Sequence, residues 1–125
     1  MDKAIIVADD SAIIRNIIEN ALKDEYVVLK ASNGKEAINH IIERKYNIVG
    51  MILDLNMPEA DGFVVLNYFR NNNLFKKYPV VMISGDDTKD TINKAFTYDI
   101  IDMLNKPFTG DKIKAMVNKM IALKD

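Results

Sequence analysis

The chain is predicted to fold as an α/β protein with a five-stranded parallel sheet and helices on both faces. The first observation is alternation, because five short apolar runs are each followed by a segment of helical periodicity. The second is that residues 48–53 and 80–83 are almost unbroken apolar runs, which is typical of strands buried on both faces. The third is length: five strand–helix units fill the 125 residues, so a single domain, 1–125, is expected.

The first two strand–helix units end near Lys45. Residues 4–8 form an apolar strand that ends at Asp9 and Asp10, and either aspartate or Ser11 is placed to cap the next helix. Residues 26–31 form the second strand, which the turn at 32–34 closes before the second helix. The apolar stripes expected to face the core are Ile14, Ile17, Ile18, Ala21 and Leu22 in the first helix, and Ala37, Ile38, Ile41 and Ile42 in the second.

The other three units repeat this alternation. Residues 48–53, 80–83 and 101–104 are the third, fourth and fifth strands, and residues 63–70 form the third helix, which the asparagines at 71–73 end. Thr88 and Thr109 are placed to cap the fourth and fifth helices. The side chains expected to face inward are Ile92, Ala95 and Phe96 in the fourth helix, and Ile113, Met116, Val117, Met120 and Ile121 in the fifth.

The order of the strands follows from their connections. Right-handed crossovers place helices on both faces of the sheet, and two doubly wound orders are plausible at this size. The flavodoxin-like order 2-1-3-4-5 fits five strands. In such a sheet, sites form beyond the carboxyl ends of the strands, at the switch point between strands 1 and 3. The informative residues are therefore those that end strands, namely Asp9, Asp10, Asp54, Ser84 and Lys106.

The composition excludes several classes of function. The chain has 17 Lys and Arg against 18 Asp and Glu, a formal net charge of −1, which provides no basic footprint for direct binding of nucleic acid. It has no Cys, which excludes disulfides and cysteine-ligated zinc. No apolar run approaches the ~20 residues of a membrane span. We expect a cytoplasmic protein without membrane insertion.

Three carboxylates are predicted to share one cleft, because Asp9, Asp10 and Asp54 end neighbouring strands. A single Asp at such a position is often only a helix cap. Three together repel one another, and a hard cation such as Mg²⁺ relieves that repulsion. The hydroxyl of Ser84 and the ammonium of Lys106 end the next two strands. A carboxylate nucleophile, a metal, a lysine and a hydroxyl are the groups that phosphoryl transfer to a carboxylate requires.

These residues resemble the signature of the receiver domain of two-component response regulators. The resemblance rests on Asp9-Asp10, on Asp54-Leu55-Asn56-Met57-Pro58 with Asp61-Gly62, on Ser84 and on Lys106-Pro107. The spacing of these residues is that of the single-domain chemotaxis (CheY-like) regulators, and the resemblance covers the whole chain. It implies that Asp54 is the phosphoacceptor. It also implies a Mg²⁺ site in which Asp10 and Asp54 are direct ligands, Asp9 acts through water and Asn56 through its backbone carbonyl.

The resemblance implies roles for the other strand-end residues. Ser84 would follow a phosphoryl oxygen, Lys106 would pair with the phosphoryl group, and the bond before Pro107 would be cis. Asp86 and Asn56 stand at positions that tune the lifetime of the acyl phosphate in the family. Met103 stands where many members have a Tyr or Phe that swings inward on activation, so an aromatic switch is not expected there, and core packing is the favoured role for Met103.

The resemblance also implies partners. The phosphodonor would be a histidine kinase or a histidine phosphotransfer protein, and Ile13, beside the acid pocket, is either half-buried or an apolar contact for it. Phosphorylation would change the face made by the fourth helix, fifth strand and fifth helix for a downstream protein that the sequence does not identify. Either a monomer or a phosphorylation-dependent dimer is compatible with this. His40, far from the strand ends, is not expected to bind metal or phosphate.

A stand-alone signalling protein is the favoured organisation, and three alternatives remain open. The first is a receiver domain cut from a larger regulator with a DNA-binding or enzymatic output. The second is a turnover phosphatase, which needs a second acid two residues after the nucleophile, where this chain has Asn56. The third is a flavodoxin-like binding module that acts without phosphorylation, although no Gly-rich phosphate loop follows the first strand. The protein is not expected to be a turnover enzyme.

Overall fold

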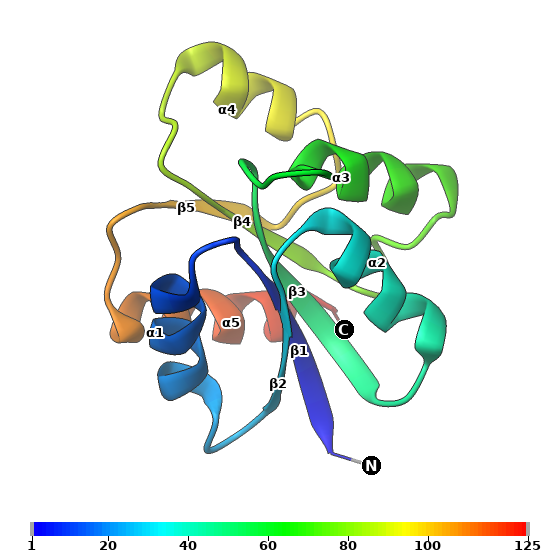
Figure 1. The fold of residues 1–125 in the computed structure, drawn as a ribbon, viewed down its shortest axis with the longest axis vertical. Helices are drawn as coiled ribbons and strands as arrows, with labels where there is room; N and C mark the ends of the chain where they lie inside the picture. Colours follow the sequence, from blue (N-terminus) through cyan, green and yellow to red (C-terminus); the bar gives the residue numbers. More distant parts are fainter. Residues whose placement is uncertain (1, 125) are drawn as a thin grey trace.

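The computed structural model describes residues 2–124 and contains five strands and five helices in strict alternation (Figure 1). The strands are β1 (Lys3–Ala8), β2 (Val27–Ala31), β3 (Asn47–Asp54), β4 (Val80–Ser84) and β5 (Asp102–Asn105). The helices are α1 (Ala12–Leu22), α2 (Gly34–Glu43), α3 (Gly62–Asn71), α4 (Lys89–Ala95) and α5 (Gly110–Lys124). All strand pairs are parallel and the order is β2-β1-β3-β4-β5, which confirms the predicted doubly wound topology.

The sheet separates two apolar cores. One core lies under α2 and α3, where Ala37, Val65 and Phe69 are buried, and the other lies under α1 and α5, where Ile18 and Ile113 are buried (Figure 1). Alternate residues of β1 enter opposite cores, and residues 4–8 are all fully buried. This two-sided burial explains why the central strands have continuous apolar sequences. At roughly 25 cal/mol per Å² of buried apolar surface, these central strands are a main source of stability.

The sequence analysis placed three side chains inward that the structure exposes. They are Ile17 (37% exposed), Ile42 (58% exposed) and Phe96 (48% exposed). Each follows or precedes a buried residue of its own helix, namely Ile18, Ile41 and Ala95. Because neighbouring residues on a helix point about 100° apart, only one of each pair can face the sheet where the contact is narrow.

Several boundaries differ from the prediction by one or two residues. The second helix ends at Glu43 rather than near Lys45, because Arg44 adopts a left-handed conformation (φ 54°) that stops the helix. The fifth strand begins at Asp102 rather than at residue 101. The caps at Ser11 and Thr109 are confirmed, since their hydroxyls accept hydrogen bonds from backbone N–H groups in the first turns of α1 and α5.

No helix within residues 2–124 combines the length and the apolar character needed to cross a membrane.

Candidate functional site

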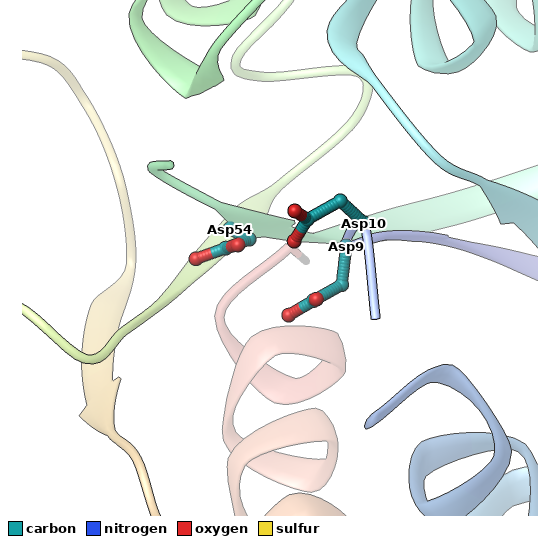
Figure 2. Close-up of side chains that lie close together, drawn as sticks. All are labelled: Asp9, Asp10 and Asp54. Atoms are coloured by element: carbon teal, nitrogen blue, oxygen red, sulfur yellow. The ribbon is translucent and has the colours of Figure 1, made fainter. Parts of the chain in front are cut away.

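The carboxyl ends of β1 and β3 bring three acidic side chains together. Ala8 of β1 pairs with Leu53 of β3, so Asp9 and Asp54 follow at adjacent positions, with Asp10 next to them. These three residues each offer an oxygen within 4.8 Å of the others. Figure 2 shows the three side chains converging on one space from the two strand ends. The predicted acid pocket is therefore present.

The carboxylates differ in their surroundings. Asp9 is fully buried, Asp54 is 2% exposed and Asp10 is exposed. The Oδ1 atom of Asp9 accepts a hydrogen bond from the Ser11 N–H at 2.9 Å, which orients the carboxylate. Its Oδ2 atom is buried and has no hydrogen-bond donor among the described residues. The negative charge on this buried oxygen is therefore compensated by an ion pair and not by a hydrogen bond.

That partner is Lys106, which lies between β5 and α5. Its Nζ atom is 2.8 Å from Asp9 Oδ2, although not in hydrogen-bonding orientation, and 3.4 Å from Asp54 Oδ2. Partial burial lowers the pKa of Lys106, but the combined attraction of the two carboxylates outweighs burial and leaves this pKa raised. The peptide bond to Pro107 is cis, as the resemblance implied. Lys106 is therefore a cation held inside the acid pocket.

Asp54 is the carboxylate whose ionisation is most strongly opposed. Its pKa is raised from 3.8 to about 6, mainly by burial and further by the nearby charge of Asp9. Lys106 and the backbone N–H of Asn56 act in the opposite direction. The ammonium of Lys106 therefore does not fully offset the burial of Asp54 and the charge of Asp9, so a further cation would be stabilised here.

The residues of the pocket fit Mg²⁺. All three side-chain ligands are carboxylates, which are hard oxygen donors, and the exposure of Asp10 leaves room for the water ligands that Mg²⁺ retains. The Oδ2 atom of Asp9 faces the Lys106 ammonium but accepts no hydrogen bond from the described residues, so it remains able to accept one from the water of a hydrated cation. Asn56 is exposed and follows Asp54 by two residues, and its backbone N–H hydrogen-bonds to the Asp54 carboxylate, while its role as a ligand through the carbonyl stays a prediction.

The hydroxyl of Ser84 makes its hydrogen bonds within its own loop in this structure. It is the last residue of β4 and is fully buried. Its hydroxyl accepts a hydrogen bond from the Asp86 N–H at 2.9 Å and donates one to the Asp86 carbonyl at 3.1 Å. The carbonyl of Ser84 accepts a hydrogen bond from the Lys106 N–H at 2.8 Å, which fixes the ends of β4 and β5 to each other. The hydroxyl is thus close to the pocket but bound to its own loop.

The family model that matches this chain is described as the response regulator receiver domain and covers residues 5–118. The chain belongs to the receiver domain family. Members of this family are signalling switches rather than turnover enzymes, and they bind Mg²⁺ in an acidic pocket. The resemblance and the fold inferred from the sequence are both confirmed.

Curated relatives of this receiver domain include short and long proteins. Chemotaxis protein CheY1 of Helicobacter pylori strain J99 is 30% identical over 97% of this chain and 98% of the relative. The sensor histidine kinase CheAY of Helicobacter pylori is 26% identical over 98% of this chain but only 15% of its own length. Among solved structures, chemotaxis regulator CheY4 of Vibrio cholerae superposes with a TM-score of 0.83 at 23% identity, covering 96% of this chain and 99% of that one. The receiver domain of Francisella response regulator 1452 gives 0.84 at 27% identity, covering 98% of each chain.

A glycine of the receiver domain places α3 directly on the end of β3, which the sequence analysis did not foresee. Gly62 begins α3 and its N–H donates to the Leu55 carbonyl at 2.9 Å. A Cβ atom at this position would lie 2.6 Å from the Asp54 carbonyl oxygen, so only glycine fits without a backbone shift. Asp61 caps the helix through the Val64 N–H. The signal in the sequence is the Asp-Gly pair before an apolar helical stripe.

Thr88 occupies the N-cap position of α4, as predicted, but the side chain that supports the beginning of the helix is that of Asp86. Thr88 precedes α4 but its hydroxyl makes no capping hydrogen bond and donates to Thr91 Oγ1. The carboxylate of Asp86 accepts the Thr88 N–H at 2.9 Å and the Thr91 hydroxyl at 3.0 Å. These hydrogen bonds, the Thr88 N–H foremost, lower the pKa of Asp86. The residue that binds the Ser84 hydroxyl through its backbone therefore also holds the beginning of α4 through its side chain.

Two further residues lie where the sequence analysis expected them. Met103 is partly buried and packs against the core under α2 and α3. His40 lies on α2, where its Nε2 atom is 2.9 Å from the Lys30 carbonyl oxygen, outside the acid pocket.

Replacing Asp54 with Asn is expected to stabilise the fold in a pH-dependent way. The pKa of Asp54 is about 6 in the folded domain against 3.8 unperturbed, so the folded state holds this proton more tightly than the unfolded chain. The stability linked to this proton is complete below pH 3.8 and is lost as the pH rises through about 6. At about pH 7.5, Asp54→Asn is expected to raise the free energy of unfolding by about 1–3 kcal/mol, and by much less at about pH 4.

Urea unfolding of both proteins at the two pH values, without Mg²⁺, measures this difference. The matched control is Asp24→Asn, which removes an exposed carboxylate outside the pocket and is expected to have no such pH dependence. An Asp54→Asn protein no more stable than the wild type at about pH 7.5 would contradict the electrostatic description of the pocket.

Proposed function

We propose that this receiver domain is a Mg²⁺-dependent phosphorylation switch in which Asp54 accepts a phosphoryl group from a phosphohistidine. The observation that carries the proposal is the convergence of three carboxylates with Lys106 between two of them. This set combines an acceptor that is a carboxylate, a cation site and a fixed ammonium. No general base is needed, because an ionised carboxylate is already a nucleophile.

The transfer exchanges one bond to phosphorus for another. A carboxylate oxygen of Asp54 forms a bond to phosphorus while the bond from phosphorus to the imidazole nitrogen of the donor breaks. The electron pair of that bond stays on the nitrogen. Bound Mg²⁺, held by Asp9, Asp10, Asp54 and Asn56, would neutralise charge on the phosphoryl oxygens. Later attack of water on the acyl phosphate releases inorganic phosphate and restores the Asp54 carboxylate, so the switch resets itself.

Lys106 and Ser84 are the residues whose contacts change in this proposal. The ammonium of Lys106 leaves its present position near Asp9 and Asp54 to pair with a phosphoryl oxygen, since a doubly charged group attracts it more strongly. The hydroxyl of Ser84 exchanges its hydrogen bonds to the Asp86 backbone for one to another phosphoryl oxygen. Asp86 is placed to influence the lifetime of the acyl phosphate, because its backbone holds that hydroxyl.

The change reaches partners through the face made by α4, β5 and α5. We propose that a downstream protein distinguishes the two states of this face. The fraction of partner that is bound changes between the two states only by as much as the affinities of the partner for them differ. Either a monomer or a phosphorylation-dependent dimer can present this face. The proposed location is the cytoplasm, where histidine kinases present their phosphohistidine.

A stand-alone organisation is part of the proposal. The alignment with chemotaxis protein CheY1 over 98% of its length supports it. The alternative, a receiver domain within a larger regulator, is favoured by relatives such as CheAY, in which the matching segment is 15% of the protein.

We propose that the phosphodonor docks on the exposed apolar side of α1. Ile13 is 72% exposed and Ile17 is 37% exposed, one helical turn apart on the helix that begins beside Asp9 and Asp10. This pair of isoleucines adjoins the acid pocket. An apolar contact next to the reacting group suits a helix that carries the phosphohistidine.

Phosphorylation by acetyl phosphate tests the central step. Wild-type protein incubated with acetyl phosphate and Mg²⁺ is expected to gain the mass of one phosphoryl group in intact-mass spectrometry, because the Asp54 carboxylate attacks phosphorus directly. No gain is expected without Mg²⁺ or in Asp54→Asn. Lys106→Met is expected to gain the group far more slowly. If the folded wild-type protein shows no adduct after a fast quench, the phosphoacceptor proposal is wrong. The protein would then be a binding module with the receiver fold.

Substitution of Ile13 tests the docking surface. Ile13→Ser is expected to slow phosphotransfer from a histidine kinase that phosphorylates the wild type by about tenfold or more, because an interface centre loses an apolar contact. Its reaction with acetyl phosphate is expected to be unchanged. The matched control is Ile42→Ser, which replaces an isoleucine on α2 that is 58% exposed, against 72% for Ile13. Equal effects of both substitutions on kinase-dependent transfer would rule out a specific role for α1.

A further inference from the structure

The helix α4 is held in place by few buried side chains. Ala95 is the only residue of α4 that is buried, and Phe96 at its end is 48% exposed. Figure 1 shows α4 at the periphery of the fold, farther from the sheet than α3. Elements with little buried apolar surface open most easily. The position of α4 therefore depends on contacts at its two ends.

At its C-terminal end, α4 is fastened to α3 through Tyr98. Tyr98 is tied to the last turn of α4 by the hydrogen bond from its N–H to the Ala95 carbonyl at 3.1 Å, and it is only 7% exposed. Its hydroxyl donates to Asn67 Oδ1 of α3 at 2.7 Å. The same oxygen accepts a hydrogen bond from Arg70 at 2.9 Å. A buried tyrosine with its hydroxyl satisfied is a directed contact and not only an apolar one.

Aromatic and cationic contacts surround this hydrogen bond. The rings of Tyr98 and Phe63 are 6.2 Å apart, and the guanidinium of Arg70 lies 4.4 Å from the centre of the Tyr98 ring. On the other side, Lys94 Nζ of α4 lies 4.0 Å from the centre of the Phe63 ring of α3. The two helices are thus joined by two cation–π contacts that share one aromatic pair.

Both ends of α4 lead back to the acid pocket. At the beginning of α4, Asp86 connects Thr88 and Thr91 with the hydroxyl of Ser84. At its end, Tyr98 contacts α3, and α3 begins at Gly62, which is packed against the backbone of Asp54. A change around Asp54 therefore has a physical route to α4 through α3 as well as through Ser84.

We propose that Tyr98 is a positioning residue that restrains α4 on α3 in the unphosphorylated protein. The restraint itself is independent of phosphorylation. Its release when Asp54 is phosphorylated rests on the proposed function and is measured separately.

Hydrogen–deuterium exchange of the unphosphorylated protein tests the restraint. Tyr98→Phe keeps the ring and removes the hydroxyl, and it is expected to speed amide exchange in residues 89–98 by about two- to tenfold, the effect of one lost hydrogen bond. Asn67→Ala is expected to have a similar effect, and the double variant no larger one, because both remove the same contact. Exchange in α2 is expected to stay unchanged. The control is Tyr46→Phe, which alters a tyrosine that is 44% exposed.

Two outcomes of this experiment overturn the proposal. One is exchange in residues 89–98 that is equal in Tyr98→Phe and wild type. The other is a uniform rise in all helices, which would make Tyr98 a contributor to global stability and not a positioning residue for α4.

A second arm separates the restraint from the switch. Mg²⁺ with beryllium fluoride, an analogue of the phosphoryl group, is expected to speed α4 exchange in the wild type and to change it less in Tyr98→Phe, where the restraint is already weakened. If the analogue leaves the wild type unchanged while Tyr98→Phe still exchanges faster, the restraint stands and the proposed switching of α4 fails. If the analogue speeds exchange equally in both proteins, release through Tyr98 is overturned.

Discussion

Burial of the Asp54 carboxylate beside the charge of Asp9, offset only in part by the ammonium of Lys106, is the constraint on which the rest of this receiver domain depends. The parallel pairing of β1 with β3 forces Asp9, Asp10 and Asp54 into one space. Lys106 reaches two of them, yet the pKa of Asp54 remains raised to about 6. A buried carboxylate with a raised pKa favours the binding of a further cation. Any change of charge on Asp54 also changes the electrostatic interactions of its neighbours.

Contacts around the pocket couple the charge on Asp54 to the positions of the loops that follow the strands. Backbone contacts fix the strand ends in place: the Lys106 N–H donates to the Ser84 carbonyl between the ends of β4 and β5, and Gly62 of α3 packs on the backbone of Asp54. Rigid central strands leave the loops after them as the parts that can move. The α4 helix lies between two of these loops with little buried surface of its own. A local change in hydrogen bonding is therefore able to move a surface that partners contact.

The topology and the pocket could be predicted from the sequence because both follow from the order of apolar and polar residues along the chain. Strands buried on both faces are continuous apolar runs, and the polar residue that ends each run marks the site, as Asp54 does. The direction of the Ser84 hydroxyl was not predictable, because its partner is a backbone group set by the local turn. The exposure of Ile42 and the contact of Tyr98 with Asn67 depend on how closely helices approach, and a helical stripe does not encode that distance.

Thermal unfolding with increasing Mg²⁺ is the most direct test of the claim that the acid pocket is a cation site whose buried carboxylates are not fully compensated by Lys106. At about pH 7.5, the melting temperature of the wild type is expected to rise steadily with Mg²⁺, because the ion binds the folded state. The rise is expected to shrink at about pH 5, where protons compete for Asp54, and in Asp54→Asn. A wild-type melting temperature that millimolar Mg²⁺ does not change, or a rise that is the same in Asp54→Asn, would contradict the account.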